Sequence, residues 1–212
     1  MSETRVIVVG CGGHARVLMD ALSRQGVAIA GLTDADAAKH GQRISGVEVL
    51  GDDSALERFT PQSTVLVNGI GSTASMDGRK AVFERLKARG YRFFTVVHPS
   101  AVLAQDVVLE EGAQVMAGAV IQTGASVGRN SIVNTGARVD HDCRVGAHVH
   151  LAPGVVLSGD VEIGEGSHVG TRAAIVQGIR VGAGCLVAAG AVVVRDVAAG
   201  MRVAGTPAKE MR

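Results

Sequence analysis

Residues 113–148 read AQVMAG AVIQTG ASVGRN SIVNTG ARVDHD CRVGAH, six hexapeptides that share one pattern. The third residue of each is valine or isoleucine, the first is small, and the sixth is mostly a residue type that tolerates turn conformations. The same register of aliphatic residues extends from Leu103 to Val193, sixteen positions without an exception. A six-residue repeat of this kind predicts a parallel β-helix whose aliphatic side chains point inward.

The repeat converts sequence separation into distance. Three hexapeptides form one triangular coil, and neighbouring coils lie one strand spacing, about 4.8 Å, apart. The repeats therefore predict roughly five coils, and we expect this domain, with a short C-terminal tail, to occupy residues 98–212. Residues one coil apart stack on each other. One expected column contains His141, Gly159, Gln177 and Arg195, and His150 is expected to stack with His168.

Residues 1–97 follow a different pattern. Short β-branched runs predict buried parallel strands, and apolar residues at helical spacing predict helices. The expected strands include residues 5–9, 27–32 and 64–67, and the expected helices are residues 14–24 and 78–89. Strands that alternate with helices predict a small Rossmann-like α/β domain with a parallel βαβ sheet.

A glycine-rich loop follows the first predicted strand. The motif G-x-G-x-x-[GA] starts at Gly10 and includes Gly12, Gly13 and His14. Between a strand and a helix, such a loop can place a pyrophosphate at the helix N-terminus. Asp34 and Asp36 follow about twenty residues later and can accept hydrogen bonds from ribose hydroxyls. The loop predicts a nucleotide site; the alternatives are a purely structural turn and a dehydrogenase, for which too little chain remains.

Composition narrows the class of protein. The formal net charge is +1 and aromatic residues make up 2% of the chain, so neither a strong field nor stacking platforms favour nucleic-acid binding. The polar N-terminus and the short apolar run behind it predict neither a signal peptide nor a membrane span. Three cysteines without a CxxC motif suit a reducing cytoplasm.

His141 is a candidate catalytic residue within the repeat. It lies two residues after the inward Val139, so its side chain is expected to point outward at a turn. The neighbouring Asp142 favours the protonated imidazole and can fix its tautomer, which suits a base for an amine nucleophile. The alternative is a solvated turn histidine.

The other residues near His141 have simpler interpretations. His148 occupies a corner position and is predicted to lie on the surface, and His150 is predicted to face outward on a flat side. These two histidines are not expected to bind a metal. Cys143 and Cys185 occupy inward positions and are interpreted as core residues.

Four stretches together carry a resemblance to a known family. They are VVGCGGHA at residues 8–15, HPSA at 98–101, NTGARVDHDC at 134–143 and HLAPG at 150–154. Together they resemble the sugar O-/N-acetyltransferases of bacterial surface-glycan synthesis, and the resemblance covers essentially the whole chain. It implies a left-handed β-helix, acetyl-CoA as co-substrate, no metal, and a homotrimer with acetyl-CoA in the groove between adjacent prisms.

The resemblance also implies roles for residues in the first domain and beside His141. The nucleotide would be held by Gly10, Gly12, Gly13, His14, Asp34 and Asp36, with Asn68 and Gly69 in the same crevice and Asn134 on the hexose. His141 would take the proton from the C4 amine that attacks the thioester. Asp142 would orient His141; the family often has glutamate at this position.

The CoA site is expected to run along the prism. By resemblance, His150 would meet the acetyl or pantetheine end of CoA. The stacking arithmetic adds that the backbone N–H of Gly159 could stabilise the thioester oxyanion. Arg195, three coils and roughly 14 Å from His141, or Lys209 would contact a CoA phosphate.

The resemblance favours a nucleotide-linked 4-amino-4,6-dideoxy sugar as substrate, with GDP-perosamine first, as in the biosynthesis of a lipopolysaccharide O-antigen. UDP- or dTDP-linked amino sugars are alternatives. So is O-acetylation of a sugar such as sialic acid, which would depend more strongly on base assistance. A structural β-helix that binds without catalysis is the non-enzymatic alternative.

Overall fold

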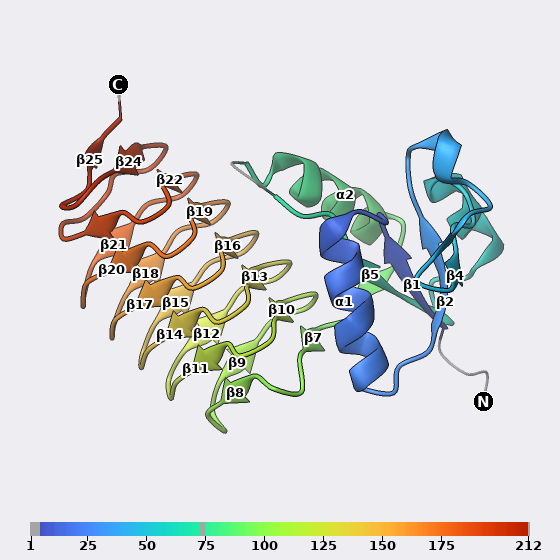
Figure 1. Cartoon of the computed structure of the whole chain (residues 1–212), viewed down its shortest axis with the longest axis horizontal. Helices are drawn as coiled ribbons and strands as arrows, with labels where there is room; N and C mark the ends of the chain where they lie inside the picture. Colours follow the sequence, from blue (N-terminus) through green and yellow to red (C-terminus); the bar gives the residue numbers. More distant parts are fainter. Residues whose placement is uncertain (1–4, 73–74, 212) are drawn as a thin grey trace.

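The computed structural model describes residues 5–72 and 75–211, which form an α/β domain and a triangular prism (Figure 1). The α/β domain contains a parallel sheet with the strand order β2-β1-β5-β6. Its strands are β1 (Arg5–Val9), β2 (Ile29–Thr33), β5 (Thr64–Asn68) and β6 (Arg92–Phe93), and its helices are α1 (Gly13–Arg24) and α2 (Asp77–Ala88). A small hairpin, β3 (Arg43–Ile44) and β4 (Val47–Glu48), and 3₁₀ helices at Ala37–Lys39 and Asp53–Arg58 complete it.

The apolar run of β1 explains its central place in the sheet. Residues 6–9 are all buried, because α1 covers one face of the strand and α2 lies on the other side. β1 lies between β2 and β5. The chain therefore crosses from β1 to β2 on one side and later to β5 on the other side, and a crevice opens at the carboxyl ends of β1 and β5. The loops after these strands begin at Gly10 and Gly69.

The prism has three parallel sheets, one for each side. The eight-stranded side contains β7 (Val96–Val97), β10 (Gln114–Val115), β13 (Ile132–Val133), β16 (His150–Leu151), β19 (His168–Val169), β22 (Leu186–Val187), β24 (Arg202–Ala204) and the antiparallel β25 (Lys209–Glu210). The six-stranded side contains β8 (Val102–Leu103), β11 (Val120–Ile121), β14 (Arg138–Val139), β17 (Val156–Leu157), β20 (Ala174–Ile175) and β23 (Val192–Val193). The five-stranded side contains β9 (Val108–Leu109), β12 (Ser126–Val127), β15 (Arg144–Val145), β18 (Glu162–Ile163) and β21 (Arg180–Val181).

The predicted inward ladder is confirmed. From Val115 to Val193 the aliphatic residue at each sixth position is at most 3% exposed, and these residues form one continuous core. Leu103 and Leu109, in the first coil, are partly buried against the same core. The strands of successive coils pair eighteen residues apart, as in Val139 with Leu157, so stacked residues can be identified from the sequence.

The turns explain the sixth position of the repeat. At this position the backbone has positive φ, which glycine adopts without strain and asparagine, aspartate and histidine tolerate better than other residues. Asn130, Asp142 and His148 occupy it with φ near +56 to +60°. The turn geometry therefore admits functional side chains at the corners of the prism.

The prism is longer than the roughly five coils predicted. Its first rung, β7, begins at Val96, two residues before the expected boundary, and the stack comprises about six coils. The last coil is shorter than the others, because β22 pairs with β24 at a separation of sixteen residues, Leu186 with Arg202. β25 then turns back against β24.

The α/β domain packs on the eight-stranded side of the prism. Met116 and Ile132 of that side share a buried apolar cluster with Leu18 and Leu22 of α1. Figure 1 shows both helices on the same side of the prism as β7, β10 and β13. None of the helices in the described residues is both long and apolar enough to cross a membrane.

Candidate active site

Backbone hydrogen bonds hold the glycine loop tightly where it leaves the end of β1. The Gly10 N–H donates to the Thr33 carbonyl at 2.6 Å, and the Gly69 N–H donates to the Val9 carbonyl at 2.8 Å. A Cβ atom at Gly69 would come within 2.9 Å of the Gly10 oxygen, so glycine is needed for this approach. At Gly12 and Gly13, by contrast, a Cβ atom would meet nothing within 4 Å.

The space above Gly12 and Gly13 therefore lies open at the start of α1. Among the described residues no side chain caps this helix end, so its first N–H groups are available to a ligand in the crevice. A helix N-terminus with free N–H groups carries partial positive charge and suits a pyrophosphate.

Asp34 lies beside this loop and is held from several directions. Its carboxylate accepts hydrogen bonds from the backbone N–H and the thiol of Cys11, both at 3.0 Å, and from Lys39 at 3.2 Å. Although burial opposes its ionisation, these bonds and one from the Asp36 N–H hold the pKa of Asp34 well below its usual range. Burial and the neighbouring Asp34 carboxylate raise the pKa of the Cys11 thiol to about 11. Asp34 is thus a fixed negative group at the crevice.

Asp36 has a different environment. Its side chain is about half exposed and caps the 3₁₀ helix that follows by accepting a hydrogen bond from the Ala38 N–H at 3.1 Å. Lys39 approaches it at 3.6 Å. Asp36 therefore stands at the rim of the crevice, outside the tight group around Asp34.

His14 connects the glycine loop to the prism. Its Nε2 lies 2.8 Å from Oε1 of Gln114, whose Nε2 in turn donates to the Asn68 carbonyl at 2.9 Å. Because the Gln114 oxygen can only accept, Nε2 of His14 carries the proton. Burial and the nearby Arg79 guanidinium lower the pKa of His14 to about 4, so the ring is neutral.

Asn134 and His150 meet on the eight-stranded side of the prism. The Asn134 amide donates to Nε2 of His150 at 3.0 Å, and Ser72 lies 2.8 Å from Nδ1 of the same ring. Burial, with help from His168, lowers the pKa of His150 to about 3. The predicted stacking with His168 is confirmed, with ring centroids 4.9 Å apart. His150 points outward from the core, as expected, but the α/β domain covers it and leaves it 6% exposed.

His141 and Asp142 lie at a different place, the corner between the six- and five-stranded sides. Nδ1 of His141 and Oδ2 of Asp142 are 2.9 Å apart, so the short aspartate arm does reach the ring. Asp140 accepts a hydrogen bond from the His141 N–H at 2.8 Å. The bond to Asp142 raises the pKa of His141 above its usual value. Because Nδ1–H donates to Asp142, Nε2 of the exposed neutral ring is free to accept a proton.

The expected column below His141 is present. Gly159 is buried, and ring atoms of His141 occupy the space that a Cβ atom at Gly159 would take. Arg195 is exposed, two coils beyond Gly159 at the same corner. Lys209 lies instead in β25, at the end of the eight-stranded side. Within one chain, only Arg195 of these two cations shares the corner with His141.

The predicted residues thus form two groups on opposite sides of the prism. The first group joins the crevice and the eight-stranded side and contains Gly10, Gly12, Gly13, His14, Asp34, Asp36, Asn68, Gly69, Asn134 and His150. The second group contains His141, Asp142 and Gly159 at the opposite corner. One chain does not bring the two groups together.

Asn68 and His148 differ from their simplest interpretations. Asn68 is 1% exposed, and its amide donates to the Arg79 carbonyl and to Asn130, so the side chain joins the two domains. The prediction that His148 lies on the surface is wrong. His148 is 0% exposed because α2 covers its corner of the prism.

Several residues in this region were not predicted. Ser72, Gln114 and Arg79 contact the predicted site residues His150, His14 and Asn68 but have no sequence motif of their own. Only the packing of the two domains brings them there. No group of three or more histidine, cysteine, aspartate or glutamate residues in the described parts of the chain could hold a metal ion.

Comparison with known proteins finds relatives of this chain. The family model of the PglD N-terminal domain matches residues 5–86. No curated protein matches the chain. A crystal structure of a mutant perosamine N-acetyltransferase from Caulobacter crescentus, in complex with CoA and GDP-perosamine, is similar throughout. It shares 38% identity and a TM-score of 0.92 over 98% of this chain and 97% of that one.

Two other solved structures have the same architecture. The acetyltransferase domain of PglB from Neisseria gonorrhoeae, in complex with acetyl coenzyme A, is 35% identical, with a TM-score of 0.91 over 99% of this chain and 100% of that one. WeeI from Acinetobacter baumannii is 24% identical, with a TM-score of 0.88 over 98% and 100% of the two chains, and supports the fold alone.

Proposed function

This chain belongs to the family of sugar acetyltransferases in which a PglD-type N-terminal domain precedes a left-handed β-helix, and from this membership we propose that it N-acetylates GDP-perosamine. The acceptor is the C4 amine of the nucleotide-linked 4-amino-4,6-dideoxy sugar, and the donor is acetyl-CoA. The observation that carries the proposal is the exposed His141–Asp142 pair on the prism. The similar perosamine N-acetyltransferase was crystallised with CoA and GDP-perosamine.

In the proposed reaction the sugar amine attacks the thioester carbonyl directly. The new C–N bond forms as the C–S bond breaks, and Nε2 of His141 takes the proton that the nitrogen loses. That proton then passes to the CoA thiolate, which leaves as the free thiol. Asp142 holds Nδ1–H and stabilises the imidazolium that forms. The Gly159 N–H would donate to the carbonyl oxygen as negative charge develops on it.

The crevice of the α/β domain suits the nucleotide. Open N–H groups at Gly12 and Gly13 would receive the pyrophosphate, and the fixed carboxylate of Asp34 would accept hydrogen bonds from the nucleoside. Asp36 stands at the rim for a further contact. Neutral His14 would bind as a hydrogen-bonding group and not as a cation. Asn134, beside His150, would contact the hexose or the acetyl end of CoA.

The separation of the two groups supports a homotrimer as the active form. Because the crevice and His141 lie on opposite sides of one prism, a nucleotide sugar held by one chain would meet His141 of a neighbouring chain. The outward residues of the six-stranded side are largely apolar and include the exposed Val102 and Val156. Such a row suits the contact between prisms. CoA would run in the groove between them, from Gly159 of one chain and His150 of the next toward Arg195 or Lys209.

The proposal has alternatives that share the same fold. UDP- or dTDP-linked amino sugars would use the same glycine loop. An O-acetyltransferase would need stronger assistance from His141 to deprotonate an alcohol. A β-helix that binds without catalysis would release no CoA. We place the enzyme in the cytoplasm, on cysteine usage, and in the synthesis of a surface glycan such as an O-antigen.

A thiol-release assay with acetyl-CoA tests the proposal. GDP-, UDP- and dTDP-linked 4-amino-4,6-dideoxy sugars and CMP-sialic acid are offered in parallel to the wild type and to His141→Asn. We expect rapid CoA release with GDP-perosamine that is largely lost in the variant. Release with another acceptor would correct the substrate, and an unaffected variant would remove His141 from the role of base.

A further inference from the structure

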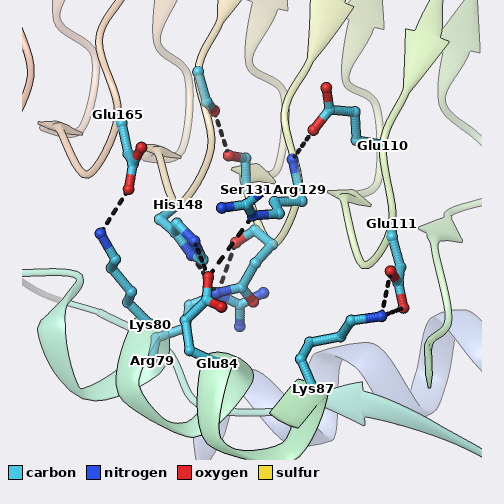
Figure 2. A network of polar contacts seen from close by, with 12 residues as sticks. Arg79, Lys80, Glu84, Lys87, Glu110, Glu111, Arg129, Ser131, His148 and Glu165 are labelled. Atoms are coloured by element: carbon cyan, nitrogen blue, oxygen red, sulfur yellow. Dashed lines mark hydrogen bonds and ion pairs between the residues drawn. The ribbon is translucent and has the colours of Figure 1, made fainter. Parts of the chain in front are cut away.

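Helix α2 lies along the corner between the five- and eight-stranded sides of the prism, and three of its charged side chains, besides the buried Arg79, reach that corner (Figure 2). Lys80 pairs with Glu165 at 2.6 Å, and Lys87 pairs with Glu111 at 2.8 Å. Between them, Glu84 accepts from His148 at 3.0 Å. Seven helical residues rise about 10.5 Å, and the two glutamates are three coils, about 14 Å, apart, so the long lysine side chains span the difference.

The charges along this contact alternate. Along α2, a negative side chain, Glu84, lies between two positive ones, Lys80 and Lys87. On the corner, the glutamates that face the two lysines lie on either side of the residues that face Glu84, which are Arg129 and His148. A shift of α2 by one coil toward the C-terminal end of the prism would bring Glu84 beside Glu165. The Lys80 pair is exposed and the Lys87 pair is partly exposed, so water screens both, and they select the register more than they stabilise it.

Beneath these pairs lies a buried chain of hydrogen bonds in which every group donates toward Glu84. The Asn130 amide donates to Nδ1 of His148 at 2.9 Å, so Nε2–H of His148 donates to Glu84. Oδ1 of Asn130 accepts from the Asn68 amide at 3.0 Å. Oδ1 of Asn68 accepts from the Ile70 N–H at 3.2 Å. His148, Asn130 and Asn68 are each at most 1% exposed.

Arg79 fixes the same elements from a second direction. It is 1% exposed, and its guanidinium donates to the carbonyls of Asn130, Asn68 and Ile70 at 2.7–3.1 Å. In the described residues no carboxylate pairs with it. One buried cation thus ties the crevice loop after β5 to a turn of the prism.

We propose that this relay, from Glu84 through His148 and Asn130 to Asn68, holds the nucleotide crevice in register with the prism, and that His148 is a positioning residue for acetyl transfer. The inference rests on the proposed function, because a substrate anchored in the crevice must present its amine to a base on a prism. His148 is fully buried between α2 and the prism, so it would act on the reaction only through the residues it holds. A displacement of about 1 Å at the reacting atoms can lower a rate about 100-fold.

Hydrogen exchange of the unliganded protein tests the relay without any substrate. In His148→Asn, which tolerates the positive φ of this turn, we expect the amides of residues 68–70 to exchange about ten-fold faster. Glu84→Leu removes the acceptor at the half-exposed end of the relay and should act in the same direction, whereas Glu84→Gln keeps an acceptor and should stay close to the wild type. Glu165→Gln, at the same corner but outside the relay, is the control.

Steady-state kinetics then link the relay to catalysis. We expect kcat to fall about 100-fold in His148→Asn, while the KM for acetyl-CoA and the pH profile stay unchanged. Unchanged exchange in both His148→Asn and Glu84→Leu, or an equal change in Glu165→Gln, would overturn the proposal. If the wild type transferred acetyl to no sugar, the proposed function would fail, and the exchange measurement would still decide the relay.

Discussion

The imidazole of His141 lies over Gly159, its neighbour one coil along the prism, and fills the place of a side chain there. The φ angle of Gly159 is not in the left-handed region, so alanine is acceptable to the backbone and only the ring opposes it. We expect Gly159→Ala to displace the ring and to lower kcat/KM about 100-fold, with little change in unfolding temperature. Activity assays and thermal unfolding check this.

A double variant separates ring displacement from other effects of Gly159→Ala. In the His141→Asn background, the proposed base is already absent, so the added alanine should lower the residual rate much less than it does in the wild type. Equal effects in both backgrounds would show that Gly159 acts independently of His141, for example through its N–H alone.

The pH dependence of transfer should report His141. The hydrogen bond that His141 donates to Asp142 raises the pKa of His141 above 6.5, and the ring acts as a base only when it is neutral. The acidic limb of kcat/KM should therefore have its midpoint above pH 6.5 and should move to lower pH in Asp142→Asn. A midpoint that is the same in both proteins would assign the limb to another group.

Acid should destabilise the contact between the domains. Well above pH 6.5, His14 and His150 are neutral in both the folded and the unfolded protein. Below it, the unfolded chain binds protons, while the folded protein resists until about pH 4 for His14 and about pH 3 for His150. Each ring should thus cost on the order of 2 kcal/mol of unfolding free energy at pH 5 relative to pH 7.

Urea unfolding at these two pH values measures this loss. His150→Gln keeps hydrogen-bonding groups but removes the titration, so its stability should fall less between pH 7 and pH 5 than that of the wild type. An equal fall in the two proteins would show that other groups control acid sensitivity.

Val156 tests the contact between prisms. It points outward on the six-stranded side and is 37% exposed in the single chain. We expect Val156→Glu to place charge in the proposed interface, dissociate the trimer and abolish transfer, while the far-ultraviolet circular dichroism of the β-helix is retained. Sedimentation measures the assembly, and a variant that remains trimeric would move the interface elsewhere.

Leu157, the next residue, points inward and tests the core. It is 1% exposed within the aliphatic ladder. Leu157→Ala should lower the unfolding free energy by about 2–5 kcal/mol, because it removes buried methyl groups and leaves a cavity between neighbouring coils. The two adjacent variants should therefore behave differently. Val156→Glu should lose assembly, which sedimentation measures, and Leu157→Ala should lose stability, which denaturant unfolding measures.

The sequence predicted the prism well because its repeat is local and strict. The small first position, the inward third position and the turn at the sixth position are all read within six residues, so Gly159 could be placed under His141 from arithmetic alone. The α/β domain was equally accessible from its strand and helix pattern. The start of the stack was harder to predict, because Val96 precedes the first regular repeat.

What the repeat does not encode is which outward residues another element covers. His148 occupies a turn position like any other, and its burial depends on α2, more than sixty residues earlier. Arg79 looks like an ordinary polar residue near the start of a helix, yet it is buried by contacts with Asn68 and Asn130. Such contacts follow from domain packing, which no local pattern in a single sequence specifies.

The reversal of β25 against β24 has a consequence for solubility. A stack of parallel coils offers unpaired backbone groups at its end, and another stack could continue the sheet there. β25 occupies that edge of the eight-stranded side with a segment of only two paired residues, Lys209 and Glu210, both charged and exposed. A short charged edge is a poor template for further strands, so this hairpin protects the prism from end-to-end polymerisation.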